Sequence, residues 1–151
     1  MIVYAINDRE SIGIIKMEKF DSLSHAKLSL RYHIVLATKH RRPCLGELEQ
    51  SVYASMSKTL KEMHVRIESM AIDHGDHIHL MIRIRNPRLS IGHIVIRLKQ
   101  QSTYDLWKSH HDELRRYYWG KEHKLWSNGY FAATVGHDIS AVGNYIEKQK
   151  H

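Results

Sequence analysis

The chain has few of the residues that cross-link or interrupt a small fold. Of its 151 residues only Cys44 is a cysteine, and two are prolines. A single cysteine excludes an internal disulfide and a zinc site built mainly of thiolates. Glycine is also scarce, and 42% of the residues are hydrophobic, which indicates a globular chain rather than a disordered one. We therefore expect a compact protein whose core is large enough to be stable without disulfides or structural metals.

Long apolar runs are also absent. No stretch reaches the roughly 18 to 20 apolar residues that a membrane-spanning helix requires. Near the start, the residues Asn7 to Glu10 are polar or charged where a secretory signal would be apolar. We therefore expect no membrane segment and a cytoplasmic location.

Negative charge is the scarcer sign. Sixteen acidic residues face 23 lysines and arginines, which leaves a net charge of +7 with histidine neutral. An excess of this kind favours a polyanion partner, because each neutralised phosphate releases counterions. A basic, solvated surface without a ligand is equally compatible with the charge alone.

The hydrophobic pattern predicts strands and helices in a definite order. Residues alternate between apolar and polar at the expected strands and recur at helical spacing at the expected helices, with Ser90 as a helix cap. The order is β-α-β-β-α-β with a further C-terminal helix, which indicates an α+β, ferredoxin-like (RRM-like) antiparallel sheet. We expect a hairpin-like extension over 1–29 and the main domain over 30–151. The predicted elements are strands at 30–40, 65–72, 76–84 and 125–135, and helices at 47–64, 91–111 and 138–151.

Two histidines interrupt the apolar pattern of the strand at 76–84. His77 and His79 flank Ile78, so their side chains point to the same side of the strand, about 7 Å apart. That separation allows both imidazoles to reach one cation. The alternative is a pair of exposed histidines on the solvated face of the sheet.

The closing helix carries two residues of interest. Tyr145 and Gln149 are four residues apart and therefore share one helical face. The carbonyl oxygen of Gln149 is a potential metal ligand, and the hydroxyl of Tyr145 is a potential nucleophile beside it. Ordinary surface polarity would produce the same spacing.

Five segments stand in order along the chain: "YHIVLATKHRRP", "HIH", "IVIRLKQQSTYDLW", "LWSNGYFAATVG" and "YIEKQ". This ordered set resembles the HUH single-tyrosine transposases, the small enzymes that move insertion sequences as single strands, and their REP-associated relatives. The resemblance runs from about Leu30 to Gln149. It departs from the family at Gly75, where a proline is usual, and residues 1–28 match no family segment.

The resemblance implies a mechanism and a ligand set. His77, His79 and Gln149 would bind one divalent ion, Mg²⁺ or Mn²⁺. Tyr145 would attack a single DNA strand at a hairpin-marked end and form a 5′-phosphotyrosine. A homodimer would supply the two nucleophiles that two ends require.

Basic residues are the candidates for holding that DNA, and the aromatic residues interleaved with them over 115–121 could stack on bases. A solvated basic loop is the alternative for these residues. The candidates are Lys39, Arg41, Arg42, Arg83, Arg85, Arg97, Lys99, Arg115 and Arg116.

Two other functions are compatible with the same pattern. One is a domesticated relative that processes repeated palindromes through the same chemistry. The other is a non-catalytic ferredoxin-like module that binds single-stranded nucleic acid. That module would be expected to carry stacking aromatics on its central strands, where this chain has histidines.

Overall fold

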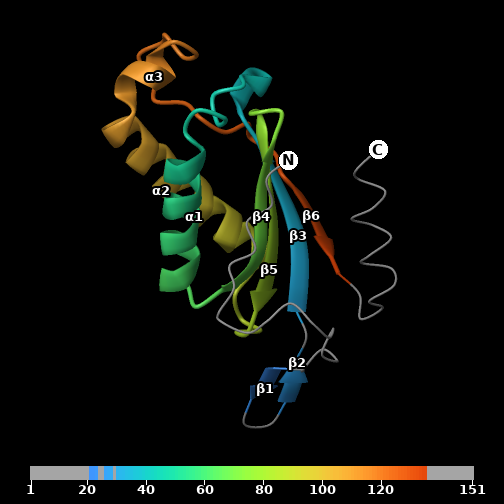
Figure 1. Ribbon diagram of the computed structural model, residues 1–151. Helices are drawn as coiled ribbons and strands as arrows, with labels where there is room; N and C mark the ends of the chain where they lie inside the picture. The colour runs from blue at the N-terminus through green and yellow to red at the C-terminus, as the bar shows by residue number, and fades with distance from the viewer. Residues whose placement is uncertain (1–20, 24–25, 29, 136–151) are drawn as a thin grey trace.

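The computed structural model describes residues 21–23, 26–28 and 30–135. A four-stranded antiparallel sheet is its centre, with the strand order β4-β5-β3-β6. Helices α1 and α2 lie together on one side of this sheet (Figure 1). The order along the chain confirms the expected ferredoxin-like fold. The strands are β3 (Leu30–Ala37), β4 (Arg66–Asp73), β5 (His77–Ile84) and β6 (Phe131–Thr134), and the helices are α1 (Glu49–Glu62) and α2 (Ile91–Ser109).

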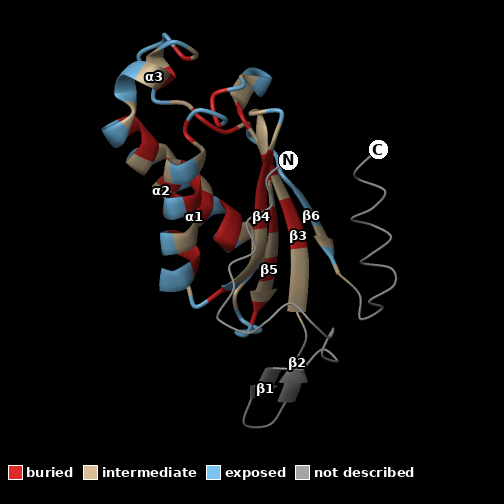
Figure 2. Ribbon diagram, viewed as in Figure 1, coloured by how far each residue is buried: buried red, intermediate tan, exposed pale blue. Residues whose placement is uncertain are grey.

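The core lies between the sheet and the two helices. Strand β5 alternates strictly, with Ile78, Leu80 and Ile82 fully buried and the residues between them half-buried. Each helix turns an apolar stripe inward at a spacing of four residues, such as Ile94 and Leu98 on α2. Figure 2 shows the buried residues concentrated where helices and sheet meet. Burial of one such side chain stabilises the fold by roughly 1.5–3 kcal/mol.

The start of α2 follows its sequence signal. The hydroxyl of Ser90 accepts a hydrogen bond from the backbone N–H of His93, so the predicted cap of α2 is confirmed.

Within the described residues, no helix has the length and apolar character that a membrane crossing requires.

The last strand is shorter than predicted. The sequence suggested a strand over 125–135, but β6 covers only Phe131–Thr134. Ahead of it, the ammonium group of Lys99 donates hydrogen bonds to the carbonyl oxygens of Ser127, Asn128 and Gly129. These carbonyls bond to a side chain rather than to a neighbouring strand, so the ladder is interrupted there.

Four short elements were not predicted individually. A five-residue helix, α3 (His111–Arg115), begins the basic stretch that follows α2. A 3-10 turn, η1 (Lys39–Arg41), follows β3. Within the extension expected over 1–29, β1 (Asp21–Leu23) pairs with β2 (Ala26–Leu28) as a two-stranded sheet. Residues 1–20 of that extension and the closing helix expected at 138–151 lie outside the described residues.

Candidate metal centre

The paired histidines project from β5 on the side of the sheet opposite the helices. Their ring centroids are 4.9 Å apart, so both imidazoles share one region of this side. We call this side of the sheet the histidine face, and among the described elements no helix covers it (Figure 1). The predicted juxtaposition of His77 and His79 is thus present in the structure.

Asp73 adds a carboxylate to the pair. It is the last residue of β4 and lies directly across from His77 in the register, with its Oδ2 3.5 Å from Nε2 of His77. Within the described part of the chain, one ligand atom each from Asp73, His77 and His79 lie within 4.8 Å of one another. Ligands of one octahedral ion at about 2.1 Å lie roughly 3 to 4.2 Å apart, so a small contraction would let these three share a cation.

Asp76 orients the first histidine. Its Oδ1 lies 2.6 Å from Nδ1 of His77, and an ionised carboxylate can only accept, so Nδ1 carries the proton. Nε2 of His77 is directed toward Asp73, 3.5 Å from its Oδ2. Burial raises the pKa of Asp76, but hydrogen bonds from His77 and Arg41 outweigh it and hold that pKa below its ordinary value.

Arg41 is held in place by an unusual turn. Its guanidinium donates to Asp76 at 2.9 Å, and both His40 and Arg41 have positive φ angles of 57° and 51°. Non-glycine residues rarely adopt this region and do so mainly where surrounding contacts enforce it. Here the hydroxyl of Thr38 donates to the carbonyl oxygen of Arg42 and helps to close the turn.

His33 orients the second histidine. Its ring stacks on His79 with centroids 5.2 Å apart, and its Nε2 lies 3.0 Å from Nδ1 of His79. Burial, together with the neighbouring His33 and His77, lowers the pKa of His79 to about 4. Burial also lowers the pKa of His33. His79 is therefore neutral at pH 7, and a neutral imidazole is the form that binds metals.

Gly75 explains the departure from the family's usual proline. Its φ is +71°, which proline cannot adopt, and a Cβ there would lie 3.2 Å from the carbonyl oxygen of Pro43. The carbonyl of Gly75 accepts a hydrogen bond from the N–H of Leu45, which fixes the β4–β5 turn against the segment that follows η1. The turn is different, and the histidines still reach their positions.

The two basic segments predicted to hold DNA meet in space. The hydroxyl of Tyr118 donates to the carbonyl oxygen of Lys39 at 2.9 Å, which joins 115–121 to 39–43. Arg42 lies over the ring of Trp119, 5.3 Å from its centroid, and Trp119 is 74% exposed. Because Arg41 contacts Asp76 and Asp76 contacts His77, this basic and aromatic surface adjoins the histidines.

Other predicted DNA-binding residues are tied to partners within the chain. Arg83 lies opposite Arg31 on the histidine face, and both contact the carboxylate of Glu68. The ammonium of Lys99 is held by the carbonyls of the 127–129 loop, and burial lowers its pKa. Arg85 and Arg116 are exposed, whereas Arg97 and Arg115 are half-buried. Arg97 faces Glu62, Arg116 pairs with Glu47, and Arg115 lies over Trp107.

Sequence reasoning did not find Asp73 or Asp76. They stand on either side of the short turn between β4 and β5, and the acidic character of that segment was the available signal for their approach. The sequence suggested that His33 approaches the histidine pair in a supporting role, and the register of β3 against β5 brings it to His79. Tyr145 and Gln149 lie outside the described residues, so their place beside this centre remains a prediction.

Fold and site together define a ferredoxin-like domain with a candidate divalent-metal centre on the face of its sheet opposite α1 and α2. The model of the IS200-like transposase family matches residues 26–149. The chain belongs to this family, which confirms the resemblance to single-tyrosine transposases.

Known proteins agree with this assignment. The chain is 32% identical over 129 residues to the transposases for insertion sequence element IS200 of Salmonella typhimurium and Salmonella typhi, covering 85% of this chain and 82% of each relative. The crystal structure of a putative transposase from Deinococcus radiodurans has the same fold, with a TM-score of 0.67, 24% identity and coverage of 85% of this chain and 96% of that one.

A REP-associated tyrosine transposase bound to a REP hairpin is also similar in fold. Its TM-score is 0.58 at 12% identity, and the match covers 94% of this chain and 74% of that one.

Proposed function

We propose that this transposase cuts and rejoins single-stranded DNA at hairpin-marked ends through a phosphotyrosine intermediate on Tyr145, with Mg²⁺ or Mn²⁺ as its metal. The observation that carries the proposal is the centre on the histidine face. Two imidazoles and a carboxylate converge there, and Asp76 and His33 each contact one imidazole on the ring nitrogen that orients it. Such outer partners are typical of metal sites rather than of incidental surface histidines.

The ligand set suits a divalent first-row ion or Mg²⁺, because it mixes imidazole nitrogens with a hard carboxylate oxygen. When bound, such an ion polarises a phosphate oxygen and stabilises the charge that develops in phosphoryl transfer. Gln149 is proposed as a further ligand on the strength of its spacing from Tyr145. Asp73 is the ligand that the described residues add to that set.

Tyr145 carries the covalent step. Its phenol oxygen attacks the phosphorus of the scissile phosphodiester, a tyrosine O–P bond forms, and the bond from phosphorus to the 3′ oxygen breaks. The phenol proton is lost, and the leaving 3′ oxygen takes up a proton to become a 3′-hydroxyl. Because the new ester retains the energy of the phosphodiester, another 3′-hydroxyl can attack it, rejoin the strand and free Tyr145.

DNA binding is proposed for the surface formed by 39–43 and 115–121. The cations of Lys39, Arg41 and Arg42 would contact phosphates, and exposed Trp119 would stack on a base. The outer cations, Arg85, Arg97, Arg115 and Arg116, would extend this contact. Arg83 and Lys99 remain proposed contacts, although each is also engaged within the chain.

The reaction has consequences for assembly and location. Two DNA ends need two tyrosines, so we propose that the protein acts as a homodimer on a cytoplasmic DNA substrate. Residues 30–151 would form the transposase domain and residues 1–29 an extension of it.

Tyr145→Phe tests the proposal most directly. A labelled single strand that carries a hairpin is incubated with Mn²⁺ and resolved on a denaturing gel. We expect a covalent protein–DNA product from the wild type and none from the variant, while DNA binding by gel shift is retained. A Tyr130→Phe variant, which changes an exposed tyrosine outside the proposed centre, serves as the matched control and should still form the product. A persistent adduct in Tyr145→Phe would contradict the assignment of the nucleophile.

A further inference from the structure

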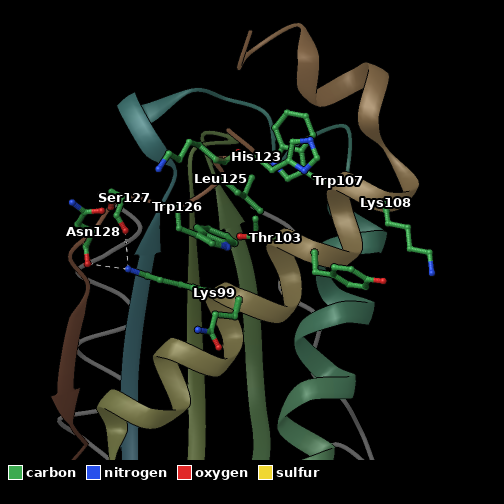
Figure 3. Close-up of a pocket in the computed structure, with 12 residues that line it drawn as sticks. Lys99, Thr103, Trp107, Lys108, His123, Leu125, Trp126, Ser127 and Asn128 are labelled. Carbon is green, nitrogen blue, oxygen red and sulfur yellow. Dashed lines mark hydrogen bonds between the residues drawn. The ribbon is translucent and has the colours of Figure 1, made fainter. Parts of the chain in front are cut away.

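A pocket on the helical side of the sheet, opposite the histidine face, has no part in the proposed chemistry. It lies between α2 and the segment 123–128, on the edge of the helical layer, and has a volume of about 920 Å³ (Figure 3). This is at the upper end of the roughly 300–1,000 Å³ typical of ligand pockets. A single unpaired nucleotide would fit within it.

The walls of the pocket are fixed by specific hydrogen bonds. The indole N–H of Trp126 donates to the hydroxyl of Ser102 at 2.8 Å, and that of Trp107 donates to the carbonyl oxygen of Lys124 at 2.9 Å. Lys99 holds the far end of the segment through the carbonyls of 127–129, as Figure 3 shows for Ser127 and Asn128. The pocket is therefore preformed rather than a gap between loosely packed elements.

Aromatic rings are presented at its surface. The imidazole of His123 lies flat on the indole of Trp107, with centroids 4.5 Å apart and planes 8° from parallel (Figure 3). His123 is itself exposed, so its outer surface extends this stack toward solvent. Tyr104, on α2, is 62% exposed, so its ring is accessible to a ligand. Flat exposed rings of this kind are the platforms on which nucleobases stack.

The polar groups around these rings suit an anionic, hydrogen-bonding ligand. The lining includes the lysines Lys99, Lys108 and Lys124, and no aspartate or glutamate is among its described residues. The ammonium of Lys108 lies 5.7 Å from the ring centroid of Tyr104, so a cation stands beside a candidate stacking surface. Lys124 pairs with Glu122 at 2.6 Å, which leaves Lys108 as the better placed phosphate contact.

The pocket is connected to the metal centre through one short segment. The backbone N–H of Ser127, at the pocket, donates to the carbonyl oxygen of Ala37. On its other side, Ala37 pairs with His77 in the sheet. One residue of β3 thus separates the pocket wall from the histidine strand, and a single DNA strand is long enough to contact both.

We propose that this pocket binds an unpaired nucleotide of single-stranded DNA, with the base stacked on Tyr104 or His123 and the adjoining phosphate near Lys108. The proposal rests on the DNA substrate of the proposed function and adds a second contact site for the same strand. The pocket contributes to binding and takes no part in the covalent step.

Binding is measured with a fluorescein-labelled ten-nucleotide oligo(dT) by fluorescence anisotropy. EDTA is present so that no divalent ion is bound at the metal centre and no cleavage occurs. Tyr104→Ala and His123→Ala are each expected to weaken binding at least about fivefold, since a lost base–aromatic stack has about this effect or more. Tyr130→Ala is the matched control. Tyr130 is also exposed, at 48%, and has Lys99 6.0 Å from its ring centroid, but it does not line the pocket. Its affinity should stay within about twofold of the wild type.

A second measurement uses the unmodified chain, so it does not depend on the folding of the variants. The indole N–H signals of Trp107 and Trp126 are followed by NMR as a five-nucleotide oligo(dT) is added. Both signals should shift if a base enters the pocket. Unchanged signals together with wild-type affinity in both alanine variants would overturn the proposal and leave the pocket to another class of ligand.

Cleavage separates this proposal from the proposed function. Tyr145→Phe should bind oligo(dT) with wild-type affinity and form no covalent product, whereas Tyr104→Ala should require at least about fivefold more DNA for half-maximal product formation. A Tyr104→Ala protein with normal binding and a slow covalent step would contradict the pocket proposal alone.

Discussion

The two faces of the sheet differ although the same strands build both. On β5, Ile78 and Leu80 face the helices and are fully buried, while His77 and His79 project from the opposite face. Strand β3 repeats the division, with Ile34 toward the core and His33 toward the histidines. Core residues and candidate metal-binding residues therefore alternate along each strand. A shift of one residue in the register would turn the histidines toward the core and the core residues toward the histidine face.

This comparison leads to a sharp expectation for neighbouring substitutions. A change on the helical face should alter the free energy of unfolding with little direct effect on the metal ligands. A change on the histidine face should alter metal binding and strand cleavage in a protein that remains folded. The four predictions that follow test this division.

The largest effect is expected from His79→Ala. Removing a candidate ligand should lower Mn²⁺ affinity more than about 100-fold, because even the outer partners of metal ligands contribute 10–100-fold. Isothermal titration with Mn²⁺ measures the affinity, and the denaturing gel measures the covalent product, which should be undetectable. Circular dichroism should show an unchanged fold. Wild-type affinity for Mn²⁺ would remove His79 from the centre.

The neighbouring substitution Leu80→Ala should have the opposite character. Leu80 is fully buried and pairs with Ile34 of β3, so the variant should lose about 2–5 kcal/mol of unfolding free energy. Urea denaturation measures this loss. Ile96→Ala, at an exposed position of α2, is the control and should change stability by less than about 0.5 kcal/mol. Equal losses in the two variants would contradict the assigned core.

Much of this division was predictable from the sequence. The alternation in β5 needs only the period of a strand, and it placed His77 and His79 on one side correctly. The helices α1 and α2 were predicted within two residues at each end because their apolar stripes are long and Ser90 marks a clear start. These features depend on contacts close in sequence, which a pattern can reveal.

Other features depend on contacts between distant residues and could not be predicted. The carboxylate of Asp73 reaches His77 because the short turn between β4 and β5 places the two residues opposite each other in the sheet. The predicted strand over 125–135 is shortened because Lys99, on α2, bonds to the carbonyls of 127–129. Similarly, the junction of 39–43 with 115–121 depends on the hydroxyl of Tyr118, which is 79 residues from Lys39.

Asp76→Asn should have an intermediate effect that sharpens the account of the histidine face. The amide is nearly the same size but carries no charge, so it orients and polarises the ring of His77 less well. Mn²⁺ affinity should fall about 10- to 100-fold, and the loss should be smaller than that of His79→Ala. Titration with Mn²⁺ again gives the value. Asp112→Asn, at a fully exposed carboxylate of α3, should leave the affinity unchanged. Wild-type affinity in Asp76→Asn would show that His77 needs no such partner.

The smallest effect concerns a structural element on the histidine face itself. Glu68 accepts hydrogen bonds from Nε and Nη2 of Arg31 and lies 3.4 Å from the guanidinium of Arg83. It therefore neutralises two like charges that face each other on β3 and β5. Glu68→Gln should therefore reduce the free energy of unfolding by about 1–2 kcal/mol, because hydrogen bonds to charged groups are lost and the two arginines repel.

Urea denaturation of Glu68→Gln is compared with that of Glu62→Gln, whose carboxylate lies 4.0 Å from Arg97 at the exposed surface and should contribute less than about 0.5 kcal/mol. Mn²⁺ affinity should be unchanged in both variants, because neither carboxylate reaches the histidines. A tenfold loss of affinity in Glu68→Gln would show that the arginine cluster and the metal centre act as one unit. An unchanged stability would mean instead that the contacts of Glu68 with Arg31 and Arg83 contribute nothing to the fold.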